Sequence, residues 1–284
     1  MKFAVEAMSR EDAEFCAEQA EREGWNPGLH DMGAFYGADP SGWFKAVDGS
    51  GRIVGSISAV AYGEKFGFIG FFVVVPEHRG GRVGLELGLR ALEHLGGRTI
   101  GQDGVFAKVA NYQTWGFEFA YRNLRHEWMG GGALPDGRGI EVEPYEAGML
   151  GEIAAYDAGG LFPCRREAFL GKWLAMPEAK GRVARDGGKI TGYGMRRRCV
   201  SGHKIGPLFA RDAGVAGALL RSLLEGVQAG EPVYLDVPEI NAPAMGLAQS
   251  LGMRVCFGTA RMYKNGRPEL DVKRIFGVTS FELG

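Results

Sequence analysis

The residues best suited to chemistry lie in the run FFVVVPEHRGGRVG, which extends from Phe71 to Gly84. An apolar strand leads through Pro76 into the turn RGGRVG at residues 79–84, and a helical pattern follows. Glycines let the backbone approach a ligand closely, and a helix start offers unpaired N–H groups and the positive end of its dipole. This combination suits a pyrophosphate group, with a plain tight turn as the alternative.

Composition and charge narrow the class of partner. The 284 residues include 33 basic and 34 acidic side chains, so the formal net charge is −1. This balance gives no bulk attraction to nucleic acid or to an anionic membrane, and we expect neither as a partner. The four cysteines are far apart without a Cys-x-x-Cys pair, which favours a reducing cytoplasm. We also expect no metal site, because the five histidines are dispersed, and no membrane span.

The elements that must hold the turn can be read from hydrophobic periodicity. The segment at 66–75 is almost wholly apolar, as in a central strand that is covered on both faces. In the first half we predict a helix at 9–24, strands at 43–47, 53–61 and 66–75, a helix at 81–95, a strand at 105–108, a short helix at 111–115 and a strand at 117–128.

The glycine-rich segment GGGALPDGRG at 130–139 is the best candidate for a linker. Beyond it the order of elements loosely recurs, which suggests duplication of one fold. We therefore predict one domain at 1–132 and a second at 140–284. In the second half we predict helices at 146–156 and 166–174, strands at 181–185, 190–198 and 204–209, a helix at 213–228, a strand at 233–236, a helix at 242–251 and a closing strand pair.

Two motifs in this order resemble those of the GNAT superfamily of acetyltransferases. The turn at 79–84 is similar to the signature Arg/Gln-x-x-Gly-x-Gly/Ala, although Arg82 stands where a glycine is usual. Its side chain must either point away from the ligand or contact a phosphate. The segment YQTWGF at 112–117 is similar to the Tyr-x-x-x-Gly-Phe segment of the superfamily.

A closer resemblance covers nearly the whole chain. It rests on the segments NYQTWGFEFAYRN (111–123), IGPLFA (205–210), LDVPEIN (235–241), ARMYKN (260–265) and IFGVTSFELG (275–284). These are similar to a bacterial tandem-GNAT subfamily, in which a complete acetyltransferase domain precedes a degenerate one. The implied fold class is α/β (α+β), with two GNAT-like domains that each hold a mixed, mostly antiparallel sheet flanked by helices.

The resemblance implies an N-acetyltransferase that moves acetyl from acetyl-CoA to an amine, by direct attack in a ternary complex. A small molecule is favoured as acceptor, because a second domain would tend to enclose the pocket. Tyr112 is the candidate acid for the departing thiolate, with a core tyrosine as the alternative. Asn111 either bonds pantetheine or caps the short helix. The implied cofactor-binding residues are Val73, Val74, Val75, Arg79, Gly80, Gly81, Arg82, Val83, Gly84 and Asn111.

The acceptor side of the site is less well defined in the sequence. Candidates to line the acceptor pocket are His30, Asp31, Asp157 and Arg165, the first two being an exposed loop pair in the alternative reading. No general base is assigned. In the second half, Asp212 occupies the position where a phosphate would sit and suits a helix N-cap, so we expect no second coenzyme A site there.

Other classes of protein are less well supported. A non-catalytic acyl-CoA or small-ligand sensor on the same scaffold is the main alternative. A nucleotide-dependent enzyme would need a phosphate-binding motif, but no Gly-x-x-x-x-Gly-Lys-Ser/Thr occurs in the sequence. A serine hydrolase would need a Gly-x-Ser-x-Gly elbow, which is also missing from the sequence.

Overall fold

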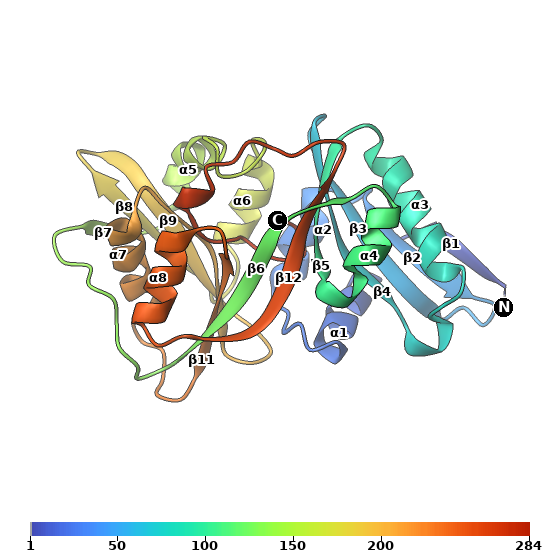
Figure 1. Cartoon of the computed structure of the whole chain (residues 1–284), viewed down its shortest axis with the longest axis horizontal. Coiled ribbons are helices and arrows are strands. Elements are labelled where there is room, and N and C mark those ends of the chain that lie inside the picture. The colour runs from blue at the N-terminus through green and yellow to red at the C-terminus, as the bar shows by residue number, and fades with distance from the viewer. Residues whose placement is uncertain (1) are drawn as a thin grey trace.

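The computed structural model describes residues 2–284, and its two halves repeat one order of elements (Figure 1). The first half contains β1 (Phe3–Ala7), α1 (Glu14–Arg22), α2 (Asp31–Ala38), β2 (Trp43–Asp48), β3 (Ile53–Tyr62), β4 (Phe66–Val74), α3 (Val83–Leu95), β5 (Thr99–Val105), α4 (Val109–Thr114) and β6 (Glu118–Met129). The second half contains β7 (Glu141–Pro144), α5 (Leu150–Asp157), α6 (Glu167–Leu174), β8 (Lys180–Asp186), β9 (Lys189–Arg198), β10 (His203–Ala210), α7 (Ala213–Leu224), β11 (Pro232–Pro238), α8 (Ala242–Ser250) and β12 (Arg254–Lys264), and β13 (Ile275–Gly277) follows. The recurrence predicted from the sequence is therefore present.

The predicted elements lack strands β1 and β7, and two further differences from the structure involve glycine. The strand predicted at 105–108 lies earlier, as β5, and residues 106–108 form a 3-10 turn. Gly101 and Gly104 interrupt the apolar alternation of β5 and hide it from a periodicity argument. Helix α2 was not predicted because its two glycines lower helix propensity. It is held by packing instead, since the Phe35 ring stacks on Trp173 of α6 at 5.2 Å.

The strands of the described residues form a single 13-stranded sheet. Its order is β1-β2-β3-β4-β5-β12-β6-β11-β10-β9-β8-β7, with β13 beside β10. The pairs β4–β5 and β10–β11 are parallel, and the remaining pairs are antiparallel. The predicted fold class, a mixed and mostly antiparallel sheet flanked by helices, is confirmed.

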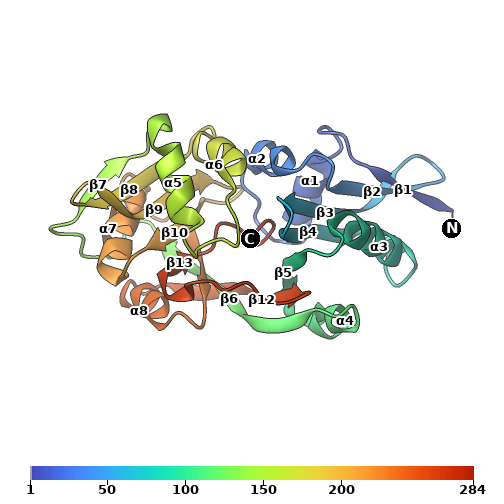
Figure 2. The same cartoon turned by 90° about the horizontal axis from the view of Figure 1, so that it is seen from above.

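The two halves exchange their last strands. Strand β6 ends the first half but pairs with β11, from Asn123 with Pro238 to Met129 with Pro232. Strand β12 ends the second half but pairs with β5, from Ile100 with Lys264 to Val105 with Thr259. Figures 1 and 2 show β6 and β12 running side by side through the middle of the molecule. One sheet therefore runs through both predicted domains.

A shared core fills the space between the halves, on the side of the sheet that carries α2 and α6 (Figure 2). Phe68 of β4, Phe169 of α6 and Tyr193 of β9 are all fully buried in it. Because this core joins residues from both halves, burying it requires the two halves to dock. No helix within residues 2–284 is long and apolar enough to cross a membrane.

Candidate acyl-transfer site

A bulge in β4 opens the sheet next to β5. The two strands pair in parallel only from Phe66 with Thr99 to Ile69 with Gln102. Phe71 then adopts a positive φ of 46°, and the pairing of β4 with β3 shifts between Ser56 and Ser58. An extra residue on one strand bends it and disrupts the ladder, so β4 turns away from β5 beyond Ile69. Backbone groups on this edge of β4 are left without a strand partner in β5.

The opening forms a groove of about 940 Å³. Its walls come from the end of β4, the glycine-rich turn, the end of β5 and helix α4. The predicted residues that line it are Val73, Val74, Arg79, Gly80, Gly81, Gly84, Asn111 and Tyr112. The structure thus brings together the two motifs that the sequence placed about 30 residues apart.

The glycine-rich turn leaves a helix start open at the groove. Gly80 has a φ of 75°, which glycine adopts at no steric cost. Helix α3 begins at Val83, and no side chain caps its N-terminus. A Cβ on Gly84 would lie 3.7 Å from both Phe72 and Val74, which are on the wall of the groove. Uncapped N–H groups and the helix dipole make this end suited to an anion.

The two arginines of the turn behave differently. Arg79 lines the groove, donates from Nε to the carbonyl oxygen of Val74 at 2.7 Å, and forms an ion pair with Glu23. Arg82 is 77% exposed and pairs with Glu86 at 2.5 Å, away from the groove. Its side chain therefore points away, which is the first of the two possibilities raised by the sequence. Val75 and Val83 also do not line the groove; Val83 is buried in the core.

Tyr112 and Asn111 enter the groove from helix α4. The Tyr112 ring lies over Gly104, where an added Cβ would come within 2.5 Å of its Cε2 atom, and it meets Phe117 edge-on at 6.4 Å. Burial raises the pKa of Tyr112 to about 12, so its hydroxyl remains protonated at neutral pH. Asn111 is exposed inside α4, whose N-cap position is Lys108, so the helix-capping interpretation of Asn111 is wrong.

The four residues proposed for the acceptor pocket lie outside this groove. His30 contacts Glu178 at 3.2 Å on the surface. The remaining three are already paired elsewhere: Asp31 with Arg197 at 2.9 Å, Asp157 with Arg166 at 2.9 Å, and Arg165 with Glu167 at 2.6 Å. Asp157 does not pair with Arg165, because its carboxylate forms a buried ion pair with the neighbouring Arg166 in the core between the halves.

Adjacent arginines offer a matched stability test. The Arg166 and Asp157 side chains are fully buried, whereas those of Arg165 and Glu167 are 58% and 42% exposed. Arg166→Met strands a buried carboxylate, so we expect it to lower the free energy of unfolding by about 3–5 kcal/mol. Arg165→Met should change it by about 0.5 kcal/mol or less, because exposed pairs contribute little. Urea unfolding of both variants measures the difference, and equal losses would contradict it.

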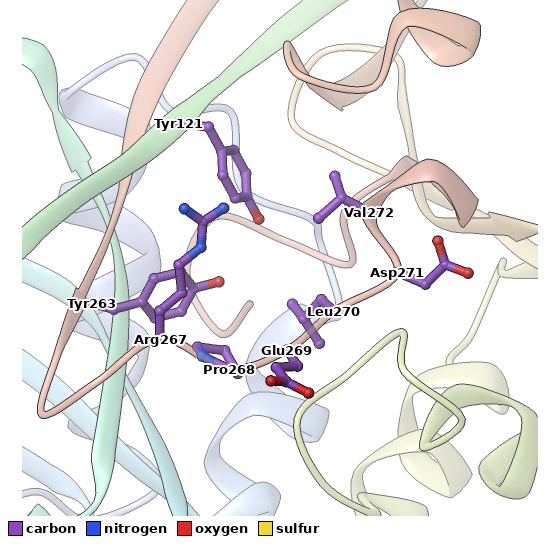
Figure 3. A pocket seen from close by; sticks show the side chains of 8 residues that line it. All are labelled: Tyr121, Tyr263, Arg267, Pro268, Glu269, Leu270, Asp271 and Val272. Carbon is purple, nitrogen blue, oxygen red and sulfur yellow. The ribbon is translucent and has the colours of Figure 1, made fainter.

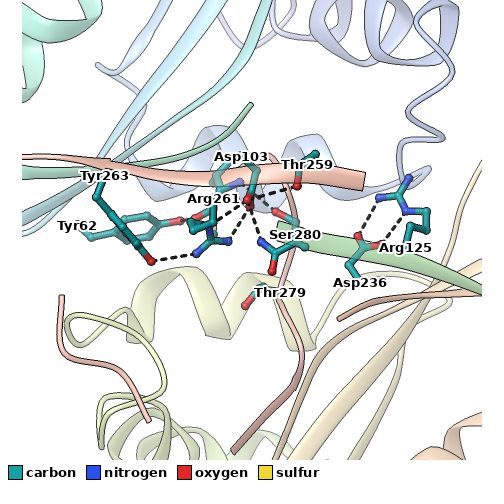
Figure 4. A network of polar contacts seen from close by, with 12 residues as sticks. Tyr62, Asp103, Arg125, Asp236, Thr259, Arg261, Tyr263, Thr279 and Ser280 are labelled. Atoms are coloured by element: carbon teal, nitrogen blue, oxygen red, sulfur yellow. Dashed lines mark hydrogen bonds and ion pairs between the residues drawn. The ribbon is translucent and has the colours of Figure 1, made fainter. Parts of the chain in front are cut away.

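The groove is also lined by residues that the sequence analysis did not select. They are Glu23, Trp25, Gln102, Asp103, Phe257, Thr259, Phe281 and Glu282. Asp103 accepts from Arg261 at 2.6 Å and from Asn123 at 2.8 Å, and Arg125 pairs with Asp236 at 2.7 Å (Figure 4). Hydrophobic periodicity could not identify these residues as neighbours, because they come from four distant parts of the chain. These parts are β5, the residues after α1, strand β12 and the C-terminal segment.

A second cavity, of about 460 Å³, lies beside β6 and β12. Figure 3 shows Arg267 beside the rings of Tyr121 and Tyr263, and the Arg267 guanidinium lies 5.5 Å from the Tyr121 ring centre. The residues Glu269 and Asp271 are also on its wall. It shares no lining residue with the groove. The cavity is therefore separate from the turn and from Tyr112.

The second half contains the counterpart of the groove, but the chain itself fills it. Strands β10 and β11 pair in parallel only from His203 with Val233 to Ile205 with Leu235. Beyond that point β13 pairs with β10. Helix α7 is capped as predicted, since Asp212 accepts from the N–H of Val215 at 3.0 Å. Both the space and the helix end that an anion would use are occupied by protein.

Comparison with known families agrees with this geometry. A model described as the acetyltransferase (GNAT) family matches residues 6–117, and one described as an acetyltransferase (GNAT) domain matches residues 153–277. The chain belongs to the GNAT superfamily. Its two halves match separate models, so it is a tandem GNAT protein.

Individual relatives support the same assignment. A holothin acyltransferase of Pseudoalteromonas sp. (strain SANK 73390) is 28% identical over 278 residues, covering 97% of this chain and 92% of the relative. A Pyrococcus horikoshii protein provisionally described as an acetyltransferase superposes with a TM-score of 0.84 at 21% identity, covering 99% of this chain and 96% of its own. A tandem GNAT protein from the clavulanic acid biosynthesis pathway superposes with a TM-score of 0.64 at 16% identity. The superposition covers 94% of this chain and 99% of that protein's chain. The chain of 284 residues is itself an acyltransferase.

Proposed function

We propose that this acyltransferase moves acetyl from acetyl-CoA to the amine of a small molecule, by direct attack in a ternary complex. The observation that carries the proposal is the divergence of β4 from β5, which places an uncapped helix start and Tyr112 on the walls of one groove. Acetyl-CoA needs both a site for its diphosphate and a slot for its extended arm. Within residues 2–284, the groove offers both together.

The residues present fit acetyl-CoA. In the proposal, the N–H groups at residues 80–84 bind the diphosphate, and Arg79 adds a positive charge at the same end. The arm lies along the open edge of β4 at Val73 and Val74, with Asn111 on the opposite wall. Glu23 already neutralises part of the charge of Arg79, so the backbone supplies most of the diphosphate contacts.

The proposed reaction requires control of one proton and one developing negative charge. A primary alkylamine has a pKa of about 10, so it must lose a proton before its nitrogen can attack. As the N–C bond forms, charge develops on the thioester oxygen, and unpaired N–H groups of β4 are suited to stabilise it. The C–S bond then breaks, and the Tyr112 hydroxyl donates a hydrogen bond to the departing sulfur. With its pKa near 12, Tyr112 stabilises this charge better than it gives up a proton.

We further propose that residues 1–132 supply the coenzyme A site and that residues 140–284 form the acceptor wall. Support comes from β13, which occupies the counterpart groove, and from Phe257, Thr259, Phe281 and Glu282, which complete the first groove. Because β12 is exchanged, neither half has its complete sheet without the other.

Calorimetry tests the proposal directly. We expect one acetyl-CoA to bind per chain, because the counterpart groove is filled. Release of free thiol from acetyl-CoA in the presence of a panel of small amines measures transfer. Two bound molecules per chain would contradict the structural role given to the second half. Binding without amine-dependent thiol release would favour the sensor on a GNAT scaffold.

A further inference from the structure

The C-terminal segment enters the groove at the point where β4 and β5 separate. The carbonyl oxygen of Glu282 lies 2.0 Å from the position that a Cβ on Gly70 would take, so only glycine fits there. The hydroxyl of Tyr62 donates to the carbonyl oxygen of Leu283 at 3.1 Å and fixes the segment against the sheet. The bulge at Phe71 follows directly. Residue 282 is therefore held at the point where β4 and β5 begin to separate.

Glu282 is a buried acid on the wall of the groove. The residue is 6% exposed, and its Oε2 atom is buried without a hydrogen-bond partner among the described residues. The other acids on the wall are engaged, Glu23 with Arg79 and Asp103 with Arg261. A buried carboxylate oxygen without a partner is costly, and such groups persist where a ligand or a reaction uses them.

Cations from both halves lie near this carboxylate but are bound to other groups. Arg125 of β6 pairs with Asp236 of β11, and Arg197 of β9 pairs with Asp31 of α2. Burial lowers the pKa of Lys204 of β10, and the charge of Glu282 opposes that shift. Lys204 donates to the carbonyl oxygen of Trp25 at 3.0 Å. These cations are therefore engaged elsewhere, and Glu282 Oε2 keeps no hydrogen-bond partner within residues 2–284.

The walls beside Glu282 are aromatic. Trp25, Phe257 and Phe281 line this end of the groove, and the Arg125 guanidinium lies 4.7 Å from the centre of the Phe281 ring. An apolar surface with a single available carboxylate suits a ligand that carries one cationic amine on a hydrophobic body.

We propose that Glu282 is the general base of the transfer and that the acceptor is a primary amine on an apolar or aromatic body. The inference rests on the proposed function. The ammonium group gives a proton to the Glu282 carboxylate, which frees the nitrogen lone pair. The N–C bond to the acetyl carbon forms, the C–S bond breaks, and the leaving thiolate takes up the second proton, which the nitrogen loses as it becomes an amide. Glu282 releases the first proton to solvent and returns to its ionised form.

Glu282→Gln with two acceptors of nearly equal shape tests the proposal. Phenethylamine is mostly charged at neutral pH, whereas O-benzylhydroxylamine has the same length and an uncharged amino group. We expect kcat/KM for phenethylamine to fall about 100- to 10,000-fold, because general base catalysis contributes that much. For O-benzylhydroxylamine the fold-loss in kcat/KM should be smaller by a factor of at least about ten, since its nitrogen needs no prior deprotonation.

Acetyl-CoA affinity and urea unfolding of the variant show whether the groove stays intact. Glu269→Gln, on the wall of the separate cavity, is the matched control and should retain the activity of the unmodified enzyme. Equal losses for both acceptors would overturn the base role and leave a structural one. Unchanged activity in Glu282→Gln would overturn this inference alone. An unmodified enzyme that binds acetyl-CoA but acetylates no amine would overturn the proposed function and this inference with it.

Discussion

Gly84→Glu is expected to raise the Kd for acetyl-CoA by about 1000-fold, a loss of about 4 kcal/mol. Gly84 is the second residue of α3, and its missing side chain leaves room above Phe72 and Val74. A glutamate there fills the groove and places a negative charge at the helix end that would bind a diphosphate. Like charges in a partly desolvated groove repel strongly, so both effects oppose binding. Calorimetry with acetyl-CoA measures the change.

Two further variants separate these causes. An added Cβ at Gly84 makes only ordinary contacts at 3.7 Å, so Gly84→Ala should weaken binding far less than the glutamate does. Gly97 follows the other end of α3 and has open space around it, so Gly97→Glu adds the same charge away from the groove and should leave the affinity unchanged. Wild-type affinity in Gly84→Glu would place the coenzyme A site elsewhere.

Tyr112→Phe should lower kcat by about 100- to 1000-fold, the usual effect of losing a donor to a developing charge. The phenylalanine ring retains the contacts with Gly104 and Phe117, so the fold and the groove should persist. Acetyl-CoA affinity should hardly change, because the hydroxyl acts on the sulfur only as the C–S bond breaks. Steady-state kinetics with a saturating amine, together with calorimetry, measures both quantities.

The pH dependence adds an independent check on Tyr112. Burial raises the pKa of Tyr112 to about 12, so the phenol is protonated throughout the range from pH 6 to pH 10. No limb of the rate profile in that range should come from Tyr112, and the profile of Tyr112→Phe should keep its shape at a lower rate. Tyr145→Phe, in the second half, serves as the control. Full turnover in Tyr112→Phe would remove this residue from the mechanism.

Most residues proposed for the cofactor side come together on the wall of one groove, because that side is built from local structure. Gly80, Gly84 and Tyr112 are set by a strand, a turn and two helix starts, each with its own residue preferences. Arg82 marks the limit of this reasoning, since its direction depends on Glu86 one helical turn later. The residues proposed for the acceptor side lie outside the groove, and Asp31 and Asp157 form buried ion pairs with Arg197 and Arg166 instead.

The sequence alone indicated most of the elements in both halves, although not β1, α2 or β7. It also indicated the glycine-rich turn, the Tyr112 motif and the capped, acidic start of α7. These depend on backbone preferences and short-range periodicity, which a single chain displays directly. Only the tertiary structure decided that β6 and β12 exchange sheets, that β13 closes the second groove, and that Glu282 reaches the first one. The physical reason is that an apolar strand can pair equally well with either sheet edge. Which edge it joins is settled by burying the shared core between the halves, an interaction that no local pattern encodes.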